Sequence, residues 1–478
     1  MGKIILVQPC GLNWEAGQRD MSRLANIMPP IGLCSLASWL EKHGHQALIC
    51  DLYAFPEDET RLMDTVRTEK PSFVGFSATT SSFLEAVQLA EKIKEAHPGV
   101  KTIFGGVHVS ALGGELMRNF RVMDYAVAGE GENALLDLMN REGKPPFSAG
   151  GIFYRQDGEV SWSGKGTQID DLDRLPFPAY DKLKGFPRQY KLPLFSFPKS
   201  PATIAVTSRG CLFSCTYCDR SVFGRTYRYH SPAYLIDWFS DLNKRFGIRH
   251  LNLYDDNLTL NGERVVELCE ALIRAGLPLS FNCASRPERL NRDLLRIMKR
   301  AGCWMISLGI ESGDAELLQR HRSHPADLDL IRERVHLIRS MGIRVKGLFM
   351  LGLPGETQES IQRTRDFILS LPLDDFNLTL FAPFPGAACY KDLNRHGVFT
   401  EKWELTNCLN VLFTPKGLTA EELDAHFKGI YRAYYKRFGV LFRYVTLAGR
   451  SGDSWIRFLR HLGSFLALRK HYRAGRSR

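Results

Sequence analysis

The sequence predicts an α/β protein with an N-terminal doubly wound parallel sheet, a central run of six strand–helix repeats and a helical C-terminal segment. Three observations predict this fold class. Short apolar strands alternate with amphipathic helices through the first 140 residues, which is typical of a parallel sheet covered by helices. Six further strands, most of them followed by a helix pattern, lie between residues 203 and 386. After about residue 400 the apolar periodicity is helical.

The composition is that of an ordinary globular protein. The chain has 478 residues, of which 44% are hydrophobic and 24% charged, enough for two or three domains. This excludes a disordered, collagen-like or disulfide-scaffold protein. No run of 18 apolar residues and no basic leader with a cleavage site are present, so we expect a cytoplasmic location. There, the eleven cysteines are expected to be thiols or metal ligands.

The first 140 residues predict strands at Lys3–Gln8, Ala47–Asp51, Phe73–Ser77, Lys101–Gly105 and Tyr125–Ala128, with helices at Pro29–His43 and Ser82–Ala96. In a doubly wound sheet, ligands bind at the carboxyl ends of the strands. No G-x-G-x-x-G follows the first strand, so a dinucleotide site of the usual kind is not expected. The candidate ligand contacts at the strand ends are Ser77, Thr79, Thr80, Gly105, Gly106, His108, Gly129, Glu130, Gly131 and Glu132.

The central region begins with a hairpin and a linker. Ile152–Ser163 has a hairpin pattern with Asp157-Gly158 at the turn, and Ile169–Pro178 is an acidic, proline-rich linker. The second series of strands follows at Thr203–Thr207, His250–Tyr254, Leu279–Cys283, Met305–Ile310, Val345–Leu351 and Phe376–Phe381. We therefore divide the chain into four parts. They are an N-terminal doubly wound domain (1–145), a hairpin and linker region (146–195), the domain of six strand–helix repeats (196–400) and a basic helical C-terminal segment (401–478).

A cysteine triplet follows the first strand of this second series. Cys211, Cys215 and Cys218 have the spacing C-x3-C-x2-C. Three thiolates on one short loop can bind three irons of a [4Fe–4S] cluster and leave the fourth iron open, whereas four cysteines would saturate it. Zinc is the chemical alternative, but no second pair of cysteines or histidines stands nearby at zinc-finger spacing.

With this motif after a first strand, the sequence resembles the radical S-adenosylmethionine (SAM) superfamily. The resemblance implies a partial (β/α)6 barrel with polar residues at the carboxyl ends of its strands. It places Tyr217, just before the third cysteine, against the adenine of SAM. The segments Gly309–Gly313 and Leu353–Glu356 resemble the SAM-contacting strand ends of the superfamily. The SAM-binding residues implied in this way are Tyr217, Asp255, Arg286, Glu311, Ser312 and Leu353.

The N-terminal region resembles the cobalamin-binding domain joined to many radical SAM enzymes. The similar segments are Met28–Leu33, Glu41–His45, Gly105–Leu112 and Gly129–Glu132. The resemblance implies that the strand-end residues given above contact cobalamin. Asp424-Ala-His426-Phe-Lys-Gly429 formally matches a cobalt-ligating motif, but it lies in a helical C-terminal segment, and Pro9–Gln18 after the first strand has no histidine. Cobalt is therefore expected to lack a protein histidine ligand.

The implied reaction is radical chemistry on an inert carbon. A reduced cluster cleaves SAM to a 5′-deoxyadenosyl radical, which abstracts hydrogen from an unactivated carbon, and cobalamin then delivers a methyl group to a hydrophobic or natural-product substrate. An oxidative cyclase or ring-forming enzyme of the same architecture, without net methylation, is the alternative. The resemblance also implies a flavodoxin or ferredoxin type electron donor. No catalytic acid or base is assigned.

An RNA-modifying, methylthiotransferase-like enzyme is a further alternative. Such an enzyme needs a second cluster, for which Cys10, Cys34 and Cys50 are available. Cys34, however, lies inside a helix pattern, where a core thiol is expected. The C-terminus also lacks the pattern of a small RNA-binding β-barrel. Nucleic acid is therefore not the expected partner.

The basic character of the chain is confined to its end. The whole chain has a net charge of +11. The segment Phe427–Arg478 accounts for all of it, because it contains 13 lysines and arginines and a single acidic residue, Asp453. Helices are expected at Glu421–Arg443 and Ser454–Lys470, the second with an apolar stripe flanked by arginines. This helix either lies in a membrane interface, which favours a lipid substrate and a membrane-associated protein, or packs over the barrel mouth.

Overall fold

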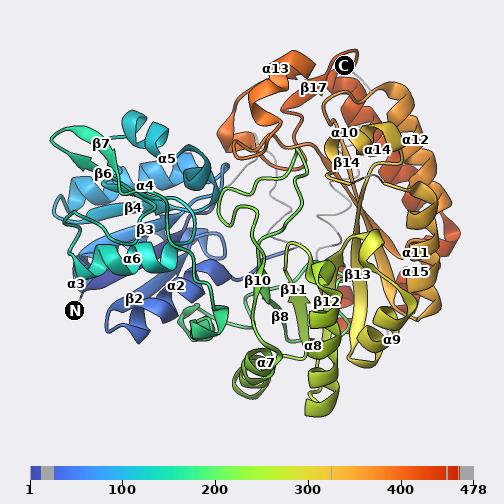
Figure 1. Ribbon diagram of the computed structural model, residues 1–478, viewed down its shortest axis with the longest axis horizontal. Coiled ribbons are helices and arrows are strands. Elements are labelled where there is room, and N and C mark those ends of the chain that lie inside the picture. Colours follow the sequence, from blue (N-terminus) through green and yellow to red (C-terminus); the bar gives the residue numbers. More distant parts are fainter. Residues whose placement is uncertain (1, 12–25, 325, 448–450, 461, 463–478) are drawn as a thin grey trace.

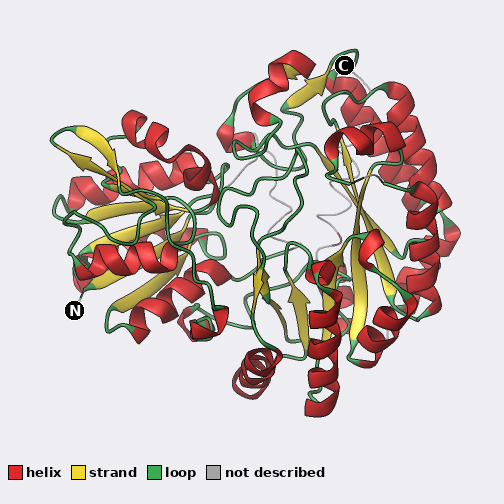
Figure 2. Ribbon diagram, viewed as in Figure 1, coloured by secondary structure: helices red, strands yellow, loops and turns green. Residues whose placement is uncertain are grey.

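The structure, a computed structural model, describes residues 2–11, 26–324, 326–447, 451–460 and 462. Two α/β bodies lie side by side (Figure 1). One is a twisted sheet with helices on both faces, and the other is a curled sheet with helices along its outer face (Figure 2). Among the described residues, no helix is long and apolar enough to cross a membrane.

The first body is built on a seven-stranded sheet in the order β2-β1-β3-β4-β5-β6-β7. The first five strands pair in parallel. The predicted doubly wound sheet is confirmed, and each of these five strands starts and ends within one residue of its predicted bounds. The strands are β1 (Lys3–Gln8), β2 (Gln46–Asp51), β3 (Phe73–Ser77), β4 (Lys101–Gly105), β5 (Tyr125–Val127), β6 (Ile152–Gln156) and β7 (Glu159–Trp162).

Helices cover both faces of this sheet because its strands are apolar on both sides. In β1, Ile4 and Leu6 pack against α2 and α6, whereas Ile5 and Val7 pack in the core formed with α3, α4 and α5. Burial on both faces is what a near-continuous apolar strand predicts. The helices are α2 (Ile31–Lys42), α3 (Glu59–Glu69), α4 (Phe83–Ala96), α5 (Val107–Asn119) and α6 (Gly131–Asn140).

The predicted hairpin belongs to this sheet. β6 pairs antiparallel with β5, and β7 with β6, so the hairpin extends the edge of the parallel strands. The division that grouped it with the linker therefore separates it from the sheet with which it pairs. An uncovered edge strand exposes backbone donors and acceptors, and the hairpin satisfies those of β5. Its turn is at Asp157-Gly158 as predicted, and both residues have positive φ.

The second body contains a six-stranded parallel sheet in the order β15-β14-β13-β12-β11-β8. It confirms the six predicted repeats and curls into a half-barrel (Figure 1). The strands are β8 (Ala202–Ala205), β11 (His250–Leu253), β12 (Ser280–Ser285), β13 (Cys303–Glu311), β14 (Arg344–Leu351) and β15 (Asp375–Leu380). Its helices are α7 (Pro232–Phe246), α8 (Gly262–Ala275), α9 (Arg292–Arg300), α10 (Ala315–His321), α11 (Leu328–Ser340) and α12 (Gln358–Ser370).

After the half-barrel, the described part of the chain forms a small β-hairpin followed by helices. Helix α13 (Leu393–His396) precedes the pair β16 (Gly397–Phe399) and β17 (Phe413–Pro415), and α14 (Ala420–Tyr435), α15 (Phe438–Thr446) and α16 (Gly452–Arg460) follow. The single helix predicted at Glu421–Arg443 is wrong, because it is broken before Phe438. Tyr435 near the end of α14 and Tyr444 in α15 both donate to Oδ1 of Asp375, which requires the chain to turn back between them.

Helix α16 packs against the loop that precedes β8. Its Ser454 accepts from the backbone N–H of Phe195, and Arg457 donates to the carbonyl of Leu192. The same loop reaches the start of β11, where Phe197 contacts the ring of His250. The prediction that this helix packs over the mouth is therefore wrong. The part of the predicted helix beyond Leu462 lies outside the described residues.

Candidate active site

The three cysteines lie on a loop whose two ends are paired. Strands β9 (Ser208–Arg209) and β10 (Arg228–Tyr229) form a short antiparallel ladder, and residues 210–227 between them are called the cysteine loop here. Gly210 opens this loop with φ +87°, and a Cβ there would lie 2.2 Å from the carbonyl oxygen of Thr226. Only glycine fits such a close approach of two backbones.

The cysteine side chains are near enough to one another to influence each other's charge. Burial and the neighbouring Cys215, Asp256 and Cys211 raise the pKa of Cys218 to about 12. Burial also raises the pKa of Cys211. The free thiols of Cys211 and Cys218 are thus protonated at neutral pH, and binding of iron would release those protons.

The residue types of the cysteine loop suit an iron–sulfur cluster. Throughout the described residues, no three Cys, His, Asp or Glu side chains converge on a point where one metal ion could be held. A [4Fe–4S] cluster needs a separate thiolate for each of three irons. The three cysteines of the loop supply that donor set.

A buried histidine ties the middle of the cysteine loop to the barrel. Nε2 of His321, at the end of α10, lies 2.7 Å from the carbonyl oxygen of Pro354, which only accepts, so Nε2 carries the proton. Nδ1 therefore accepts from the hydroxyl of Thr216 at 2.7 Å. The carbonyl of Thr216 also accepts from the N–H of Cys389 at 3.0 Å. The loop is thereby held at two further strand ends of the barrel.

Asp255, a predicted SAM contact, holds the entrance of the cysteine loop. Its carboxylate accepts from the N–H groups of Thr207 and Ser208 at 2.6 and 2.9 Å and from the Thr207 hydroxyl at 2.5 Å. The buried guanidinium of Arg264 lies 3.9 Å away. This carboxylate is fully engaged in holding the backbone. Its neighbour Asp256 is exposed and acts electrostatically on Cys211 and Cys218.

Two arginines and a glutamate meet at the carboxyl ends of β12 and β13. The register of β13 against β14 shifts before Glu311, which has φ +71°. Such a bulge re-aims a side chain. Burial raises the pKa of Glu311, and the charges of Arg322 and Arg286 oppose that rise. The hydroxyl of Tyr217 hydrogen-bonds Glu311, so this site reaches the cysteine loop.

The same arginines carry buried donors without partners. Nη1 and Nη2 of Arg286, and Nε and Nη1 of Arg322, find no hydrogen-bond acceptor among the described residues. Arg286 stacks on Phe213 of the cysteine loop, with its guanidinium carbon 4.2 Å from the ring centre, and Nη2 of Arg322 donates to Glu288 at 3.0 Å. Buried unpaired guanidinium donors are costly, and a bound carboxylate would satisfy them. SAM carries such a carboxylate, so the residues fit it.

The other two predicted SAM contacts have different surroundings. The hydroxyl of Ser312 pairs with that of Thr364 at 2.8 Å and accepts from the N–H of Asp314. Leu353 is fully buried in the core beneath the strand ends. The structure does not bring either side chain to the arginine pair, and their role in SAM binding stays a prediction.

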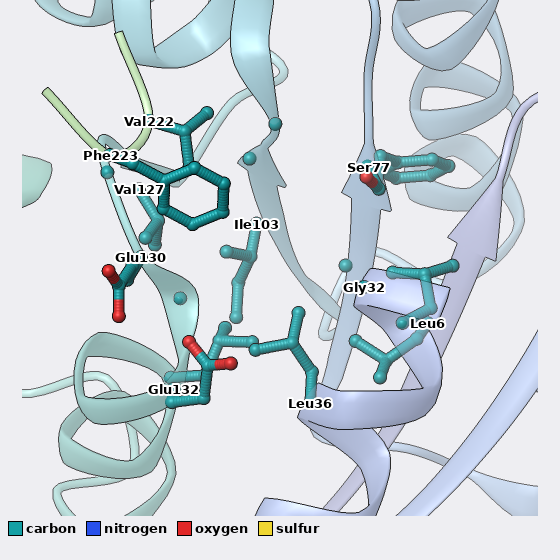
Figure 3. Close-up of a pocket in the computed structure, with 18 of the residues that line it drawn as sticks. Leu6, Gly32, Leu36, Ser77, Ile103, Val127, Glu130, Glu132, Val222 and Phe223 are labelled. Atoms are coloured by element: carbon teal, nitrogen blue, oxygen red, sulfur yellow. The ribbon is translucent and has the colours of Figure 1, made fainter. Parts of the chain in front are cut away.

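A cavity of about 210 Å³ opens at the carboxyl ends of β1, β3, β4 and β5 (Figure 3). An apolar cavity of about 150 Å³ holds a benzene molecule, so this one has room for a larger flat group. Seven of the ten predicted cobalamin contacts line it. The lining residues are Leu6, Gly32, Leu33, Leu36, Gly75, Phe76, Ser77, Ile103, Gly105, Gly106, Val127, Gly129, Glu130, Gly131, Glu132, Leu135, Arg209, Val222 and Phe223.

This cavity fits one part of a cobalamin molecule. Its wall is mostly apolar, which suits an aromatic group, while the bulk of so large a cofactor would have to lie outside against the strand ends. Gly32 leaves open space where a Cβ would project. Gly106, with φ +99°, has Ala78 O only 2.6 Å from the position of a Cβ. Glycine at both positions lets the backbone form the cavity edge.

The remaining three predicted cobalamin contacts lie elsewhere. The hydroxyl of Thr79 pairs with Ser82 at 3.0 Å, and Thr80 pairs with Nδ1 of His108 at 3.3 Å. The ring of His108 is buried between Phe83 and Trp403, and this burial lowers its pKa to about 4. None of the three lines the cavity, because the chain turns from the strand ends into the helices here.

The sequence did not indicate the roof of the cavity. Val222 and Phe223 come from the cysteine loop, and they lie over the strand ends of the first body (Figure 3). The carbonyl of Phe223 accepts from Nε2 of Gln168 in the linker at 3.0 Å. These contacts join segments that are far apart in the chain, so no local sequence pattern predicts them. Gly32 and Leu36, one helical turn apart in α2, could have been found from that spacing.

Comparison with known proteins agrees with both bodies. Residues 205–368 match the Radical SAM superfamily, and residues 20–139 match the B12 binding domain. An uncharacterized methyltransferase of Pyrococcus horikoshii is 28% identical over 87% of this chain and 89% of its own length. The anaerobic magnesium-protoporphyrin IX monomethyl ester cyclase of Rubrivivax gelatinosus is 26% identical over 91% of this chain and 77% of its own. The hopanoid C-3 methylase of Methylococcus capsulatus is 27% identical over 77% of this chain and 69% of its own length.

Solved structures show the same arrangement of domains. The radical SAM methyltransferase TsrM of Kitasatospora setae, with cobalamin and a [4Fe–4S] cluster bound, superposes with a TM-score of 0.66 at 18% identity, over 90% of this chain and 81% of that one. The cobalamin-dependent radical enzyme OxsB gives a TM-score of 0.65 at 18% identity, and this chain spans about half, 52%, of its length. The fold, the cysteine loop and the cavity thus agree with the two domain matches, and the chain contains both a radical SAM domain and a B12-binding domain.

Proposed function

We propose that this enzyme methylates an unactivated carbon of a hydrophobic or natural-product substrate. One observation carries the proposal: the loop that holds the three cysteines also forms the roof of the cavity in the B12-binding domain. When bound, the cluster with SAM supplies radical chemistry, and cobalamin supplies a transferable methyl group. A substrate carbon between the two cofactors could meet both. The methyltransferase names of two relatives support the same reaction class.

The chain's own residues would bind and orient these groups. Cys211, Cys215 and Cys218 would hold the cluster. Arg286 and Arg322 would bind the carboxylate of SAM through their unpaired donors. We place Glu311 beside them as an acceptor for the SAM amino group, with its position fixed by the hydroxyl of Tyr217. Glycines at the strand ends would admit cobalamin, whose cobalt would have no histidine ligand from the cavity wall.

A cyclase without net methylation is the second candidate, and the similarity to a porphyrin ester cyclase over 91% of this chain favours it. The two are separated by SAM labelled with deuterium in its methyl group. The methylase transfers the label to cobalamin and then to product, and a Cys215→Ala variant transfers none to product. An enzyme that cleaves SAM to 5′-deoxyadenosine but never moves the labelled methyl group is not a methylase.

A membrane surface is the proposed source of the substrate. Large apolar side chains are exposed on α15 and α16. In α15, Phe438 is 82% and Val445 61% exposed, and Phe442 is exposed as well. In α16, Ile456 and Leu459 are exposed. Basic side chains stand in the last turn of both helices, Arg443 in α15 and Arg460 in α16, as in interfacial helices that bind anionic lipid. We expect the chain to sediment with vesicles containing anionic lipid and a Phe438→Glu variant to stay in solution. Equal sedimentation of the two would contradict this contact.

The reductant is proposed to be a flavodoxin or ferredoxin type protein. Cleavage of SAM at a cluster consumes a single electron, and small electron-transfer proteins deliver electrons one at a time. The expected result is that reduced flavodoxin replaces dithionite in supporting SAM cleavage by the reconstituted enzyme. Failure of both flavodoxin and ferredoxin, with dithionite active, would assign the donor to another class.

A further inference from the structure

We propose that four buried charged residues couple the cysteine loop to the cobalamin cavity. They are Glu130 and Glu132 of the first body and Arg209 and Arg228 of the second, and together they are called the interdomain ion cluster. The inference rests on the proposed function, because it concerns the same two cofactor sites. It assigns positioning residues to them.

Each arginine stands at one end of the cysteine loop. Arg209 and Arg228 are direct partners in the ladder of β9 and β10. Arg209 donates to Oε2 of Glu130 at 3.1 Å and to Oε1 of Glu132 at 2.6 Å. Arg228 donates to both carboxylate oxygens of Glu130, at 3.2 Å to Oε2. Glu130 therefore bridges the two ends of the loop.

The ion cluster is buried and balanced. The side chains of Glu130 and Glu132 are 1% and 5% exposed, and those of Arg209 and Arg228 are 13% and 12% exposed. Two arginines opposite each other in a ladder repel, and the two carboxylates compensate for both. Burial acts to raise the pKa of Glu132, but the charge and hydrogen bond of Arg209 outweigh it and hold the pKa below its usual range. Glu132 is thus charged at neutral pH.

The same residues touch the cavity. Glu130, Glu132 and Arg209 line its wall, and Val222 and Phe223 of the loop roof it. The guanidinium of Arg209 lies 5.8 Å from the ring centre of Phe223. A ligand in the cavity therefore contacts the loop, and a cluster on the cysteines fixes that loop. Two ligands that favour one conformation of a shared segment assist each other's binding.

A purely structural role, holding the two bodies together, is the competing explanation. Other ion pairs offer a matched control for it, since they join the first body to the linker away from the cysteine loop. Nζ of Lys182 lies 2.6 Å from Oε1 of Glu41 in α2. Loss of this pair should weaken attachment of the linker without affecting the loop.

The test measures the dissociation constant of hydroxocobalamin for the full-length chain, by visible absorbance, with and without a reconstituted cluster. In the wild type, the cluster is expected to tighten binding by about 5- to 150-fold, the usual range of coupling between sites. Glu130→Gln keeps the shape but not the charge, and the ratio should fall toward unity. Because Glu130 also lines the cavity, the affinity without the cluster is measured separately for each variant. Lys182→Met should keep the wild-type ratio.

The outcomes are distinguishable. A wild-type ratio of unity, or a Glu130→Gln variant that keeps the wild-type ratio, overturns the coupling while the proposed function stands. Absence of hydroxocobalamin binding by the wild type overturns both. If Glu130→Gln does not fold by circular dichroism, Arg228→Lys serves in its place, because lysine keeps the charge but not the bidentate contact. An intermediate ratio in Arg228→Lys supports the coupling, and an unchanged ratio contradicts it.

Discussion

Arg286 has two buried guanidinium nitrogens, Nη1 and Nη2, with no acceptor among the described residues. Since a hydrogen bond between charged groups contributes about 1.5–3 kcal/mol, Arg286→Met should weaken SAM binding by roughly 10- to 150-fold. Equilibrium dialysis with the reconstituted enzyme measures this. Arg289 contacts the ring of Phe213 as well, at 5.5 Å, but is exposed, so Arg289→Met is the matched control and should bind SAM normally. Equal loss in both variants would contradict a carboxylate site at Arg286.

His108 is a buried imidazole whose pKa is lowered from 6.5 to about 4 by burial. The unfolded chain takes up a proton near pH 6.5 while the folded chain does not, so this residue removes stability as the pH falls from about 6.5 to 4. Between pH 7 and pH 5 the effect is about 2 kcal/mol. His108→Leu should reduce the pH dependence of the free energy of unfolding by that amount, as measured by urea denaturation at both pH values.

The same variant tests the place of His108 in the site. Its ring does not line the cavity, so His108→Leu should bind hydroxocobalamin as the wild type does. A large loss of cobalamin affinity, with the fold intact, would mean that the histidine contacts the cofactor after all. An unchanged pH dependence would show that the ring is not buried in its neutral form.

At the scale of elements, the first turn of α2 borders the cavity. A Cβ at Gly32 would meet open space, and leucine favours a helix over glycine, so Gly32→Leu should fold and partly fill the cavity. We expect cobalamin affinity to fall at least about tenfold, or 1.4 kcal/mol. The matched control is Gly429→Leu in α14, which also has open space and belongs to the rejected cobalt-ligand motif. Loss of affinity in Gly429→Leu alone would place cobalamin at the C-terminal helix.

Elements with strong local signals could be predicted from the sequence. β1, β3 and β4 have the predicted bounds because each is a short apolar run bounded by polar or small residues, and burial on both faces leaves no alternative. The break between α14 and α15 could not be predicted. It depends on Asp375, some 60 residues earlier, which Tyr435 and Tyr444 both reach. The position of α16 likewise depends on contacts with residues 192–197, which no periodicity encodes.

Within the site, the cysteine spacing predicted the loop, and the strand ends predicted seven of the residues that line the cavity. The roles of Asp255 and His108 were beyond sequence reasoning, because residue type and position do not show whether a polar group is already hydrogen-bonded. The buried partners of Glu130 are 79 and 98 residues away. Only the folded chain shows that these charges meet.

At the scale of the whole molecule, the two bodies share a segment. The cysteine loop belongs to the barrel by sequence, yet it roofs the cavity of the first sheet and is anchored to that sheet by Glu130 and Glu132. A cofactor in either site is therefore positioned by residues of both bodies. Catalysis that needs two cofactors around one substrate depends on such fixed geometry.

The most direct test of this account is metal analysis of the full chain. The protein is purified without oxygen, reconstituted with iron and sulfide, mixed with hydroxocobalamin and separated from free cofactor. The account predicts about four irons and about one cobalt per chain, with the iron lost in Cys215→Ala. Four irons without cobalt would contradict the joint cofactor site, and zinc in place of iron, with no cleavage of SAM, would contradict the assignment of the cysteine loop.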